Sequence, residues 1–466
     1  MQKSMRVYTA FTLLILCGLL SVSFTRAQGY TVPAQAGTDG YPARYPWEFQ
    51  YIQKENNPPR SVGRFVSAAI ASFNDYFAIA YYDDTNHMLM IASLWPNHAG
   101  NCGTSNNWIC LTLDGGVDFV GRFSSIDIWG ESLDDWKMAI SYYDDTHRAL
   151  KAAVYTCYMG NCTWEIATIL VPDSPEVSIG LNSSIKFYST GIPAIVFIKT
   201  NSEINHNTIA YAYPVTSGGN CGEGSATGLW QCSDLSFLAD NAGYPVLDFN
   251  FDDNPYIAYY DMDTGALNLG VYTGGGLCGV DGYGWVCPII DGGDANVGLY
   301  PSLIAPHADG EPFRIAYLDQ TNGHLKYFDS DWGEPVVLDE MGTSAAPKAI
   351  SMRLDPEGLP VIAYQSFASE FSPAELRLAR PYEVYGEGLI GNCGDVPPGY
   401  LFQYWRCNTL DHGGQYVDEA GYASMVLTSK GLVGIAYTEY DSYNDVTSLK
   451  FAYQTYLKNF LPLAVK

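Results

Sequence analysis

Short apolar runs centred on an isoleucine recur along the whole chain. They combine Ile, Val and Ala with Tyr or Phe, and several of them end in Asp. Runs of this length, rich in β-branched and aromatic residues and bounded by turn residues, predict strands. The seven runs are 78–83, 139–144, 194–197, 256–261, 315–319, 361–364 and 434–437.

The sequence around the first run predicts a unit of four strands. Residues 67–72 alternate, 76–83 and 88–94 are apolar, and 108–113 form a short β-branched run. Asn, Asp, Thr and Gly fill the connections, as expected of turns. No stretch has the pattern of a long helix, so the fold class is all-β.

A tryptophan precedes each isoleucine at a nearly constant distance, from 27 to 32 residues. The distance from each isoleucine to the next tryptophan varies much more, so the variable segment of each unit lies in one connection. Seven copies of such a unit predict radial β-repetition. The seven tryptophans are Trp47, Trp108, Trp164, Trp230, Trp285, Trp332 and Trp405.

The two ends of the chain indicate that the ring is closed. The last unit runs through Ile435 and 449–453 without a following tryptophan, whereas Trp47 stands 32 residues ahead of Ile79. The N-terminal strand therefore completes the last sheet, a device that removes both free sheet edges. We predict a seven-bladed β-propeller of four-stranded blades over residues 47–456, with its last blade closed by the strand 47–52.

The segments outside the repeats suggest export. Lys3 and Arg6 precede an apolar run that ends near Ala27, which is typical of a signal peptide over 1–27. An uncleaved anchor is the alternative, although the run is short for a membrane span. Residues 28–46 form an N-terminal extension, and 457–466 form an apolar tail that is either a surface-retention element or a frayed terminus. We expect a protein that is secreted or held at the cell surface, with no membrane span in the mature chain.

The formal net charge of −26 narrows the classes of partner. An acidic surface repels nucleic acid and anionic lipid and favours cations or basic partners. The alternative is that the charge only keeps the protein soluble.

Ten cysteines beyond the apolar N-terminal run fall into five close couples, each inside the variable segment of one unit. Export and close spacing predict five local disulfides. Zinc is the competing interpretation, but the chain has no Cys-x-x-Cys and only seven histidines. The couples are Cys102 with Cys110, Cys157 with Cys162, Cys221 with Cys232, Cys278 with Cys287, and Cys393 with Cys407.

Three sequence elements recur within the units: Asp-Gly-Gly, then Val-Gly-Arg-Phe or Val-Gly-Leu-Tyr-Pro-Ser-Leu, and Ile-Ala-Tyr-Tyr-Asp. They occur at 114–123, 291–303 and 257–261. With these elements the chain resembles the repeats of secreted bacterial and archaeal β-propeller proteins, mostly of unassigned function. The resemblance covers almost the whole mature chain; it implies the fold and leaves the activity open.

Candidate ligand residues gather on one face of the predicted disk, opposite the cysteine hairpins. The turns between second and third strands carry aspartates, and the Val-Gly-Arg-Phe entries carry arginines. Converging carboxylates suit calcium, which we expect at Asp144 and Asp145 if any cofactor is bound. Ordinary turn chemistry is the alternative for each aspartate. The candidates are Asp83, Asp84, Asp144, Asp145, Asp261, Asp263, Asp319, Arg64 and Arg122.

The 36 tyrosines suggest glycan binding, because aromatic rims stack on sugar rings. Tyr81, Tyr142 and Tyr259 belong to the second-strand pattern and are expected to pack between blades. We predict a binding or interaction module whose ligand is a glycan or an extracellular protein. A glycan-processing enzyme of the sialidase or lyase kind and a structural envelope component are the alternatives. The Asp-box and Arg-Ile-Pro patterns of sialidases are absent, and no catalytic residues are identified.

Overall fold

The computed structural model describes residues 47–454, except 54, 57–58, 95–99, 105–106, 279–281, 294, 343–348, 367–374, 382–390, 402, 413–421 and 442–443. The expected signal peptide, the 28–46 extension and the 457–466 tail lie outside these residues. No helix in the described part has the length and apolar character needed to cross a membrane.

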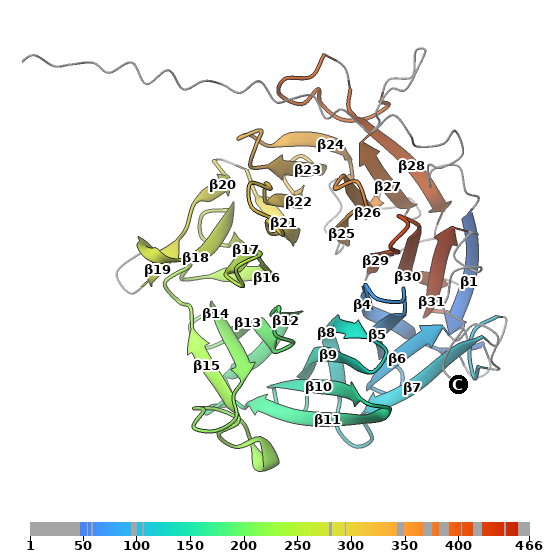
Figure 1. Cartoon of the computed structure of the whole chain (residues 1–466), viewed down its shortest axis with the longest axis vertical. Helices are drawn as coiled ribbons and strands as arrows, with labels where there is room; N and C mark the ends of the chain where they lie inside the picture. The colour runs from blue at the N-terminus through green and yellow to red at the C-terminus, as the bar shows by residue number, and fades with distance from the viewer. Residues whose placement is uncertain are drawn as a thin grey trace, which may run out of the picture. The chain divides into compact units, whose positions relative to one another are not determined.

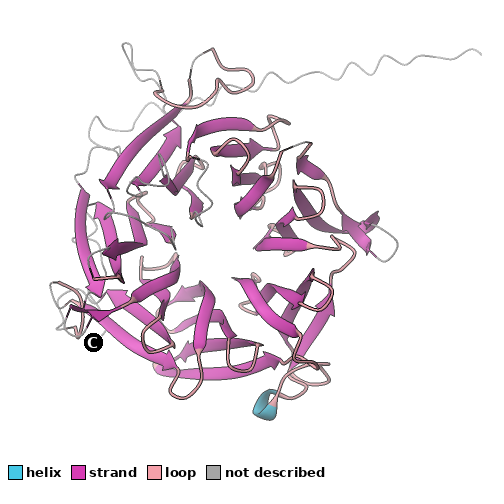
Figure 2. Cartoon of the chain, turned by 180° about the vertical axis from the view of Figure 1, so that it is seen from behind, coloured by secondary structure: helices cyan, strands magenta, loops and turns pink. Residues whose placement is uncertain are grey.

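Seven antiparallel four-stranded sheets stand around a common axis, as Figures 1 and 2 show. Within each blade the first strand lies nearest the centre of the ring and the fourth lies outermost (Figure 1). The predicted seven-bladed propeller is therefore confirmed.

The first three blades follow one another along the chain. Blade 1 is β4 (Val62–Ile70), β5 (Phe77–Asp83), β6 (Met88–Leu94) and β7 (Trp108–Asp114). Blade 2 is β8 (Val120–Ser132), β9 (Asp135–Asp144), β10 (Ala149–Tyr158) and β11 (Asn161–Leu170). Blade 3 is β12 (Val177–Phe187), β13 (Pro193–Asn201), β14 (His206–Pro214) and β15 (Trp230–Asp234), with a single 3-10 turn, Gly224–Ala226, before β15.

The next three blades keep the same order. Blade 4 is β16 (Ala242–Phe249), β17 (Pro255–Asp261), β18 (Ala266–Cys278) and β19 (Gly282–Val286), and β20 (Ile289–Asp291) also pairs with β18. Blade 5 is β21 (Val297–Ile304), β22 (Arg314–Asp319), β23 (His324–Asp329) and β24 (Val336–Glu340). Blade 6 is β25 (Ile350–Leu354), β26 (Pro360–Ser366), β27 (Glu375–Pro381) and β28 (Trp405–His412).

Blade 7 joins the two ends of the described chain. It consists of β29 (Ala423–Leu427), β30 (Val433–Asp441) and β31 (Val446–Gln454), with β1 (Trp47–Gln53) as its outermost strand. Strand β1 pairs antiparallel with β31, from Trp47 opposite Gln454 to Gln53 opposite Leu449. A short hairpin of β2 (Glu55–Asn56) and β3 (Pro59–Arg60) then leads into blade 1. The predicted closure by the N-terminal strand is confirmed.

A circle of serine hydroxyls joins the inner strands of neighbouring blades. At six interfaces a serine Oγ on a first strand accepts a hydrogen bond from a backbone N–H of the next first strand. The last of these bonds, from Ala68 to Ser424, joins blade 1 to blade 7 across 356 positions of sequence. The serine and donor pairs are Ser67 and Ile126 (3.1 Å), Ser125 and Ile185 (3.2 Å), Ser184 and Leu247 (3.2 Å), Ser302 and Met352 (3.0 Å), Ser351 and Met425 (3.0 Å), and Ser424 and Ala68 (2.9 Å).

Four blade interfaces also contain a tyrosine, an aspartate and a cation in contact. The tyrosine hydroxyl comes from the second strand of a blade and donates to an aspartate near the end of the preceding blade, while a Lys or Arg on the third strand pairs with the same carboxylate. The triads are Tyr142, Asp114 and Lys151; Tyr317, Asp291 and Lys326; Tyr364, Asp339 and Arg377; and Tyr437, Asp411 and Lys450.

The second-strand tyrosines pack between blades as expected. Tyr81 and Tyr142 are 0% exposed, and Tyr259 is 1% exposed. They belong to the cores between sheets rather than to an open rim, so they are not available to stack on a ligand.

All five predicted disulfides are present, and each joins two cysteines of one blade. They staple the hairpins formed by third and fourth strands. The register places the connections of these hairpins beside the turns between first and second strands, since Ala78 pairs with both Ala69 and Ser93. The disulfides are Cys102 with Cys110 in blade 1, Cys157 with Cys162 in blade 2, Cys221 with Cys232 in blade 3, Cys278 with Cys287 in blade 4, and Cys393 with Cys407 in blade 6.

Four of these disulfides end in a cysteine two residues after the blade tryptophan. Cys110, Cys232 and Cys407 lie in the outer strands β7, β15 and β28, whereas Cys287 follows the end of β19. Cys110, Cys232 and Cys287 are only partly buried, so these three sulfurs close hairpins at the outer edge of the ring and are not part of the central core.

Two details differ from the sequence prediction. Strand β4 begins at Val62 rather than at residue 67, so Arg64 and Arg122 lie within strands β4 and β8 and not in entry loops. Trp332 lies in the turn before β24 rather than in the outer strand. The first difference has a local cause, because a bulge in β4 interrupts the alternation on which the sequence prediction rests.

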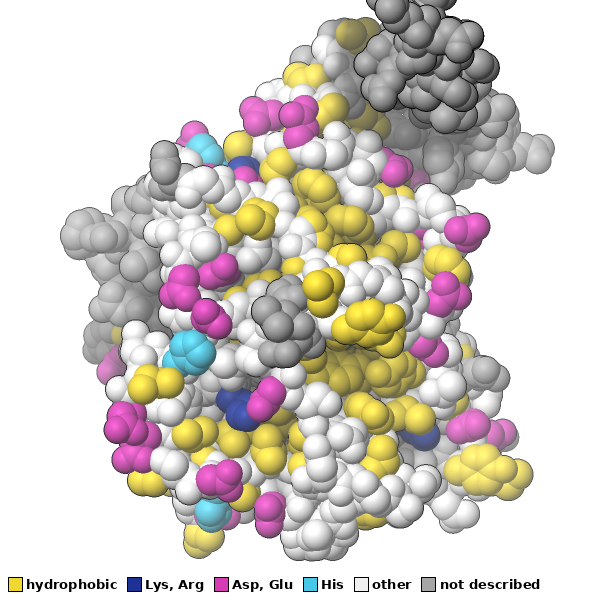
Figure 3. All heavy atoms as spheres, turned by 90° about the vertical axis from the view of Figure 1, so that its left-hand side faces the viewer, with side chains coloured by type: hydrophobic (Ala, Val, Ile, Leu, Met, Phe, Trp, Pro, Cys, Tyr) yellow, Lys and Arg dark blue, Asp and Glu magenta, His cyan; other side chains and the backbone are white. Residues whose placement is uncertain are grey.

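The outer edge of blade 4 carries exposed apolar side chains. Figure 3 faces the side of the molecule that bears β18 to β20 in Figure 1 and shows apolar patches among polar and acidic groups. The most exposed of these residues is Tyr283, at 77%. The others in this region are Tyr272, Leu277, Val286 and Ile289.

Candidate functional site

A cavity of about 280 Å³ lies on the axis of the ring and is lined by residues at the first strands of all seven blades. Aromatic rings occupy one repeated position of these strands, and we call this set the aromatic collar. Asn182 and Ala349 occupy the same position in blades 3 and 6. The aromatic collar consists of Phe65, Phe123, Tyr244, Tyr300 and Tyr422.

A repeated β-bulge shapes the first strand at the aromatic collar. The pairing of β4 with β5 shifts between Arg64 and Ser67, and Phe65 adopts a φ of 52°. The corresponding residues of the next four blades, Phe123, Asn182, Tyr244 and Tyr300, have φ values from 47° to 53°. Bulky residues seldom adopt this left-handed conformation, which costs on the order of 1 to 3 kcal/mol each.

Glycine two positions ahead of the bulge allows the blades to approach closely. Gly121 has a φ of 112°, and a Cβ atom added there would lie 2.7 Å from the Cα atom of Leu89 in blade 1. Only glycine fits this backbone conformation and contact. The Val-Gly-Arg-Phe motif thus encodes a blade contact at its glycine and a cavity-lining ring at its phenylalanine.

Hydroxyl groups hold the bulge in two blades. Ser124 donates to the carbonyl oxygen of Phe65, and Ser183 donates to that of Phe123 at 3.1 Å. Each bond runs from one blade to the collar residue of the preceding blade. The aromatic collar is therefore fixed by contacts between blades rather than by a single loop.

The rings of the aromatic collar contact one another on both sides of the cavity. The Phe65 ring centroid lies 4.6 Å from that of Phe123 and 4.8 Å from that of Tyr422. Tyr244 and Tyr300 lie 4.5 Å apart. Burial, followed by the nearby Tyr244, raises the pKa of Tyr300, so this hydroxyl is neutral and can donate a hydrogen bond.

Both predicted arginines lie beside the aromatic collar. The Arg122 guanidinium carbon is 5.5 Å from the ring centroids of Phe65 and Phe123, within the range of a cation–π contact. Arg64 pairs with Asp84 at 3.2 Å, and Arg122 pairs with Asp145 at 3.3 Å. All four charged side chains are partly exposed, so they offer donors and acceptors at the rim of the cavity.

Tyr82 lies close to both of these ion pairs. Burial, then the charge of Asp84, raises the pKa of Tyr82 to about 12. The charge of Asp145 also raises this pKa, whereas the charges of Arg122 and Arg64 lower it. The Tyr82 hydroxyl is 2.8 Å from Nδ1 of His87. The candidates Arg64, Asp84, Arg122 and Asp145 are thus brought together at the rim between blades 1 and 2.

Three of the remaining candidate aspartates, Asp83, Asp261 and Asp319, stabilise their own turns. Asp83 accepts hydrogen bonds from the backbone and side chain of Asn86, and Asp319 does the same with Asn322. Asp261 accepts from the backbone N–H groups of Asp263 and Thr264. This is the Asx-turn chemistry that was the alternative to ligand binding. Asp263 accepts a hydrogen bond from Asn241 at 3.2 Å.

The expected calcium pair, Asp144 and Asp145, divides between two partners. Asp144 is 3% exposed and accepts hydrogen bonds from the backbone N–H and the Nδ1 atom of His147, whereas Asp145 pairs with Arg122. The two carboxylates therefore face different groups.

A second set of charged side chains lies on the first strands four residues beyond the collar position. Asp248 accepts a backbone hydrogen bond from Ala305 and lies 3.1 Å from Nε2 of His307. The hydrogen bond with Asp248 raises the pKa of His307 above its usual value. Asp127, Lys186 and Arg353 occupy the same strand position in blades 2, 3 and 6; burial lowers the pKa of Arg353, and the charges of Asp127 and Asp248 oppose this.

Sequence reasoning identified the arginines beside the cavity but not the aromatic collar. The signal that could have found it is an aromatic residue two positions after glycine in the Val-Gly-x-aromatic motif, at 62–65, 120–123 and 297–300.

No family model matches the chain, and no curated protein matches it. Solved structures show distant likeness. A protein of unknown function from Dyadobacter fermentans has 10% identity and a TM-score of 0.44, over 87% of this chain and 97% of that one. The polysaccharide lyase Uly1 has 8% identity and a TM-score of 0.42, over 83% and 89%. An α-L-arabinanase from Penicillium chrysogenum has 11% identity and a TM-score of 0.38, over 68% and 89%. These similarities are too distant to bear on the activity of this chain.

Proposed function

We propose that this protein is a binding module that acts outside the cell or at its surface, and that its ligand is a glycan. The observation that carries the proposal is the aromatic collar, in which four of the five rings stand at strained backbone positions and all five line one axial cavity. The strain recurs in five successive blades, and backbone strain of this kind clusters at ligand-binding and active sites.

The chemistry of the cavity suits a sugar ring. Aromatic faces stack on the apolar face of a sugar, and hydroxyl groups can bond to its polar edge. Besides its rings, the described lining includes Asn182 and serine hydroxyls, such as those of Ser67 and Ser125, that accept a bond from the next blade and keep an O–H to donate. The volume of about 280 Å³ is near the lower end for ligand pockets, so one ring-sized unit of a longer glycan would enter.

The charged residues at the rim of the cavity favour sugar binding over glycoside hydrolysis. A glycoside hydrolase needs two carboxyl groups on either side of the bond to be cleaved. None of the described lining residues is a carboxylate, and the nearest predicted acids, Asp84 and Asp145, are each paired with an arginine. Such Arg–Asp pairs can bind the hydroxyls of a sugar without acting as acid and base.

The first prediction concerns the rings of the aromatic collar. A glycan array probed with the purified protein should identify a retained glycan, whose affinity is then measured by calorimetry. Phe123→Ala and Tyr244→Ala should each weaken binding by about 1 to 2 kcal/mol, or roughly five- to thirtyfold, because each removes a stacking surface.

Tyr283→Ala is the matched control, since it removes an exposed tyrosine from the outer edge of blade 4. It should leave the affinity unchanged. Loss of binding in Tyr283→Ala, with both collar variants binding normally, would move the site to the outer edge and contradict the proposal.

A further inference from the structure

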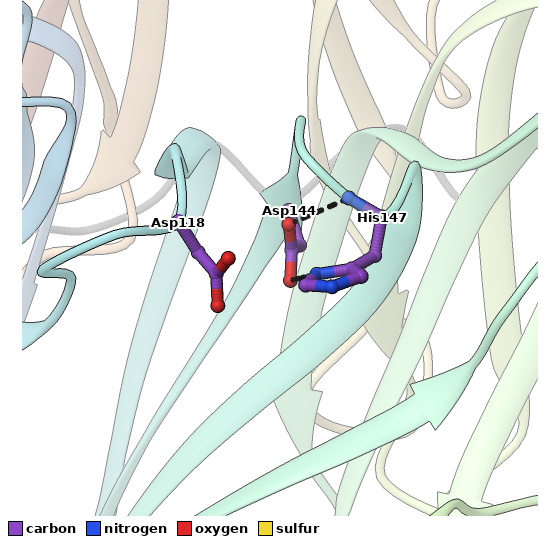
Figure 4. A group of neighbouring side chains, drawn as sticks. All are labelled: Asp118, Asp144 and His147. Atoms are coloured by element: carbon purple, nitrogen blue, oxygen red, sulfur yellow. Dashed lines mark hydrogen bonds and ion pairs between the residues drawn. The ribbon is translucent and has the colours of Figure 1, made fainter.

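Three side chains able to bind a metal meet where blade 2 begins. Asp118 precedes β8, Asp144 ends β9, and His147 lies in the turn that follows (Figure 4). One ligand atom from each residue lies within 4.8 Å of the other two. Figure 4 shows the Asp118 carboxylate beside the hydrogen-bonded pair of Asp144 and His147.

Blade 1 holds a cation at the equivalent place. Arg60 precedes Phe65 by five residues, as Asp118 precedes Phe123, and Asp83 ends β5 as Asp144 ends β9. The Arg60 Nε atom donates to Asp83 at 3.0 Å. Blade 1 therefore neutralises its buried turn aspartate with its own guanidinium, whereas blade 2 has a second carboxylate at that position.

A second difference between the two blades also favours a metal ion in blade 2. In blade 1 the residue three positions after the turn aspartate is Asn86, whose amide nitrogen donates to Asp83 at 2.8 Å. In blade 2 it is His147, whose Nδ1 lies 2.9 Å from Asp144. An asparagine amide completes a turn, whereas an imidazole is among the commonest ligands of metal ions.

We propose that Asp118, Asp144 and His147 bind a divalent transition-metal ion, with zinc or manganese as the expected class. The ion supplies the positive charge that Arg60 supplies in blade 1. One imidazole and two carboxylates suit zinc or manganese better than calcium, which takes six to eight oxygen ligands. The carboxylate that shares the ion with Asp144 is thus Asp118, whereas the sequence predicted Asp145.

The geometry needs only a small adjustment. Atoms that share an ion at about 2.1 Å from each lie at most about 4.2 Å apart. The side chain of His147 is 56% exposed and Asp118 is partly exposed, so these two can move toward the buried Asp144. Three protein ligands leave further coordination positions open to water.

This proposal is independent of glycan binding and has its own test. The full protein, treated with EDTA and dialysed, is titrated by calorimetry with zinc chloride, manganese chloride and calcium chloride in turn, and its melting temperature is recorded with each. We expect one equivalent of zinc or manganese to bind and raise the melting temperature, with at least tenfold weaker binding of calcium.

The decisive variant is Asp118→Arg, which recreates the arrangement of blade 1. It should abolish metal binding while keeping or raising the melting temperature of the metal-free protein. Asp118→Asn, which is less disruptive, should weaken binding at least tenfold. Asp173→Asn removes an exposed carboxylate from the loop before β12 and serves as the control that binds normally.

Two outcomes would overturn the proposal. One is the absence of zinc and manganese binding at millimolar concentration. The other is binding that both Asp118 variants leave unchanged, which would place the ion elsewhere. A preference for calcium would refute the assigned class of metal.

Discussion

The triads of tyrosine, aspartate and cation show how single residues decide whether a charge can lie between blades. The tyrosine opposite the cation keeps its proton: burial, then the charge of Asp291, raises the pKa of Tyr317 well above its usual value. A carboxylate in such a place is tolerated only with a cation and hydrogen bonds around it.

Blade 1 contains a neutral version of the same contact. Tyr81 donates to Gln53 at 2.7 Å, and Met90 lies opposite Tyr81 where the four triad blades have Lys or Arg. Blade 1 thus lacks both the carboxylate and the cation of the triads. Gln53 follows Trp47 by six residues, as Asp291 follows Trp285, which identifies β1 as the fourth strand of a blade at the level of single side chains.

The charged contact of blade 5 and the neutral contact of blade 1 can be exchanged by mutation. Lys326→Met should lower the free energy of unfolding by about 2 kcal/mol, because Asp291 then lacks its cation in a largely buried site. Adding Asp291→Gln, which reproduces the set found in blade 1, should recover most of the loss. Urea denaturation of the unchanged protein, the single variant and the double variant measures both effects. A double variant less stable than Lys326→Met would contradict this explanation.

At the scale of strands and hairpins, the sequence predicted what depends on regular spacing. The distance from tryptophan to isoleucine predicted the blades, and the cysteine couples predicted the disulfides. It did not predict the start of the first strands, because Gly63 and Phe65 both adopt positive φ and interrupt the alternation on which strand assignment rests. For the same reason the arginines of Val-Gly-Arg-Phe attracted attention and the neighbouring rings did not.

The metal-binding cluster was beyond sequence reasoning for a different reason. Asp144 was identified, but its neighbour Asp118 lies 26 positions earlier and reaches it only because β8 and β9 pair. Asp118 can be compared with Arg60 because each lies five residues before the bulged phenylalanine of its blade.

The disulfides lead to the third prediction of this set. Each closes a hairpin within a blade, from a separation of 5 residues for Cys157 and Cys162 to 14 for Cys393 and Cys407. Loop closure of this size contributes on the order of 2 to 3 kcal/mol each, more for the longer loop. Replacing Cys393 and Cys407 by alanine should therefore cost about 1 kcal/mol more than replacing Cys157 and Cys162.

Thermal unfolding followed by circular dichroism checks this order, and both variants should retain the β-sheet spectrum at 25 °C. Loss of the whole fold in either variant would mean that the disulfides hold the ring itself together. Peptide mapping that joined cysteines of different blades, for example Cys110 to Cys157, would contradict the pairing directly.

At the level of the whole molecule, the collar cavity depends on ring closure. The collar cavity is lined from every blade, and the serine circle runs through the junction where Ser424 of blade 7 meets Ala68 of blade 1. A ring opened at this junction would separate Tyr422 from Phe65, whose rings are 4.8 Å apart. The shape of the collar cavity therefore depends on closure of the ring by β1.

The most direct test is to remove the closing strand and measure unfolding. A chain that begins at Ser61 lacks β1 and leaves the edge of β31 without its partner, which invites aggregation as well as loss of stability. Compared with a chain that begins at Arg44, we predict a melting temperature lower by at least about 10 °C, or aggregation on size-exclusion chromatography. A monomer with an unchanged melting temperature would contradict closure of the ring by the N-terminal strand.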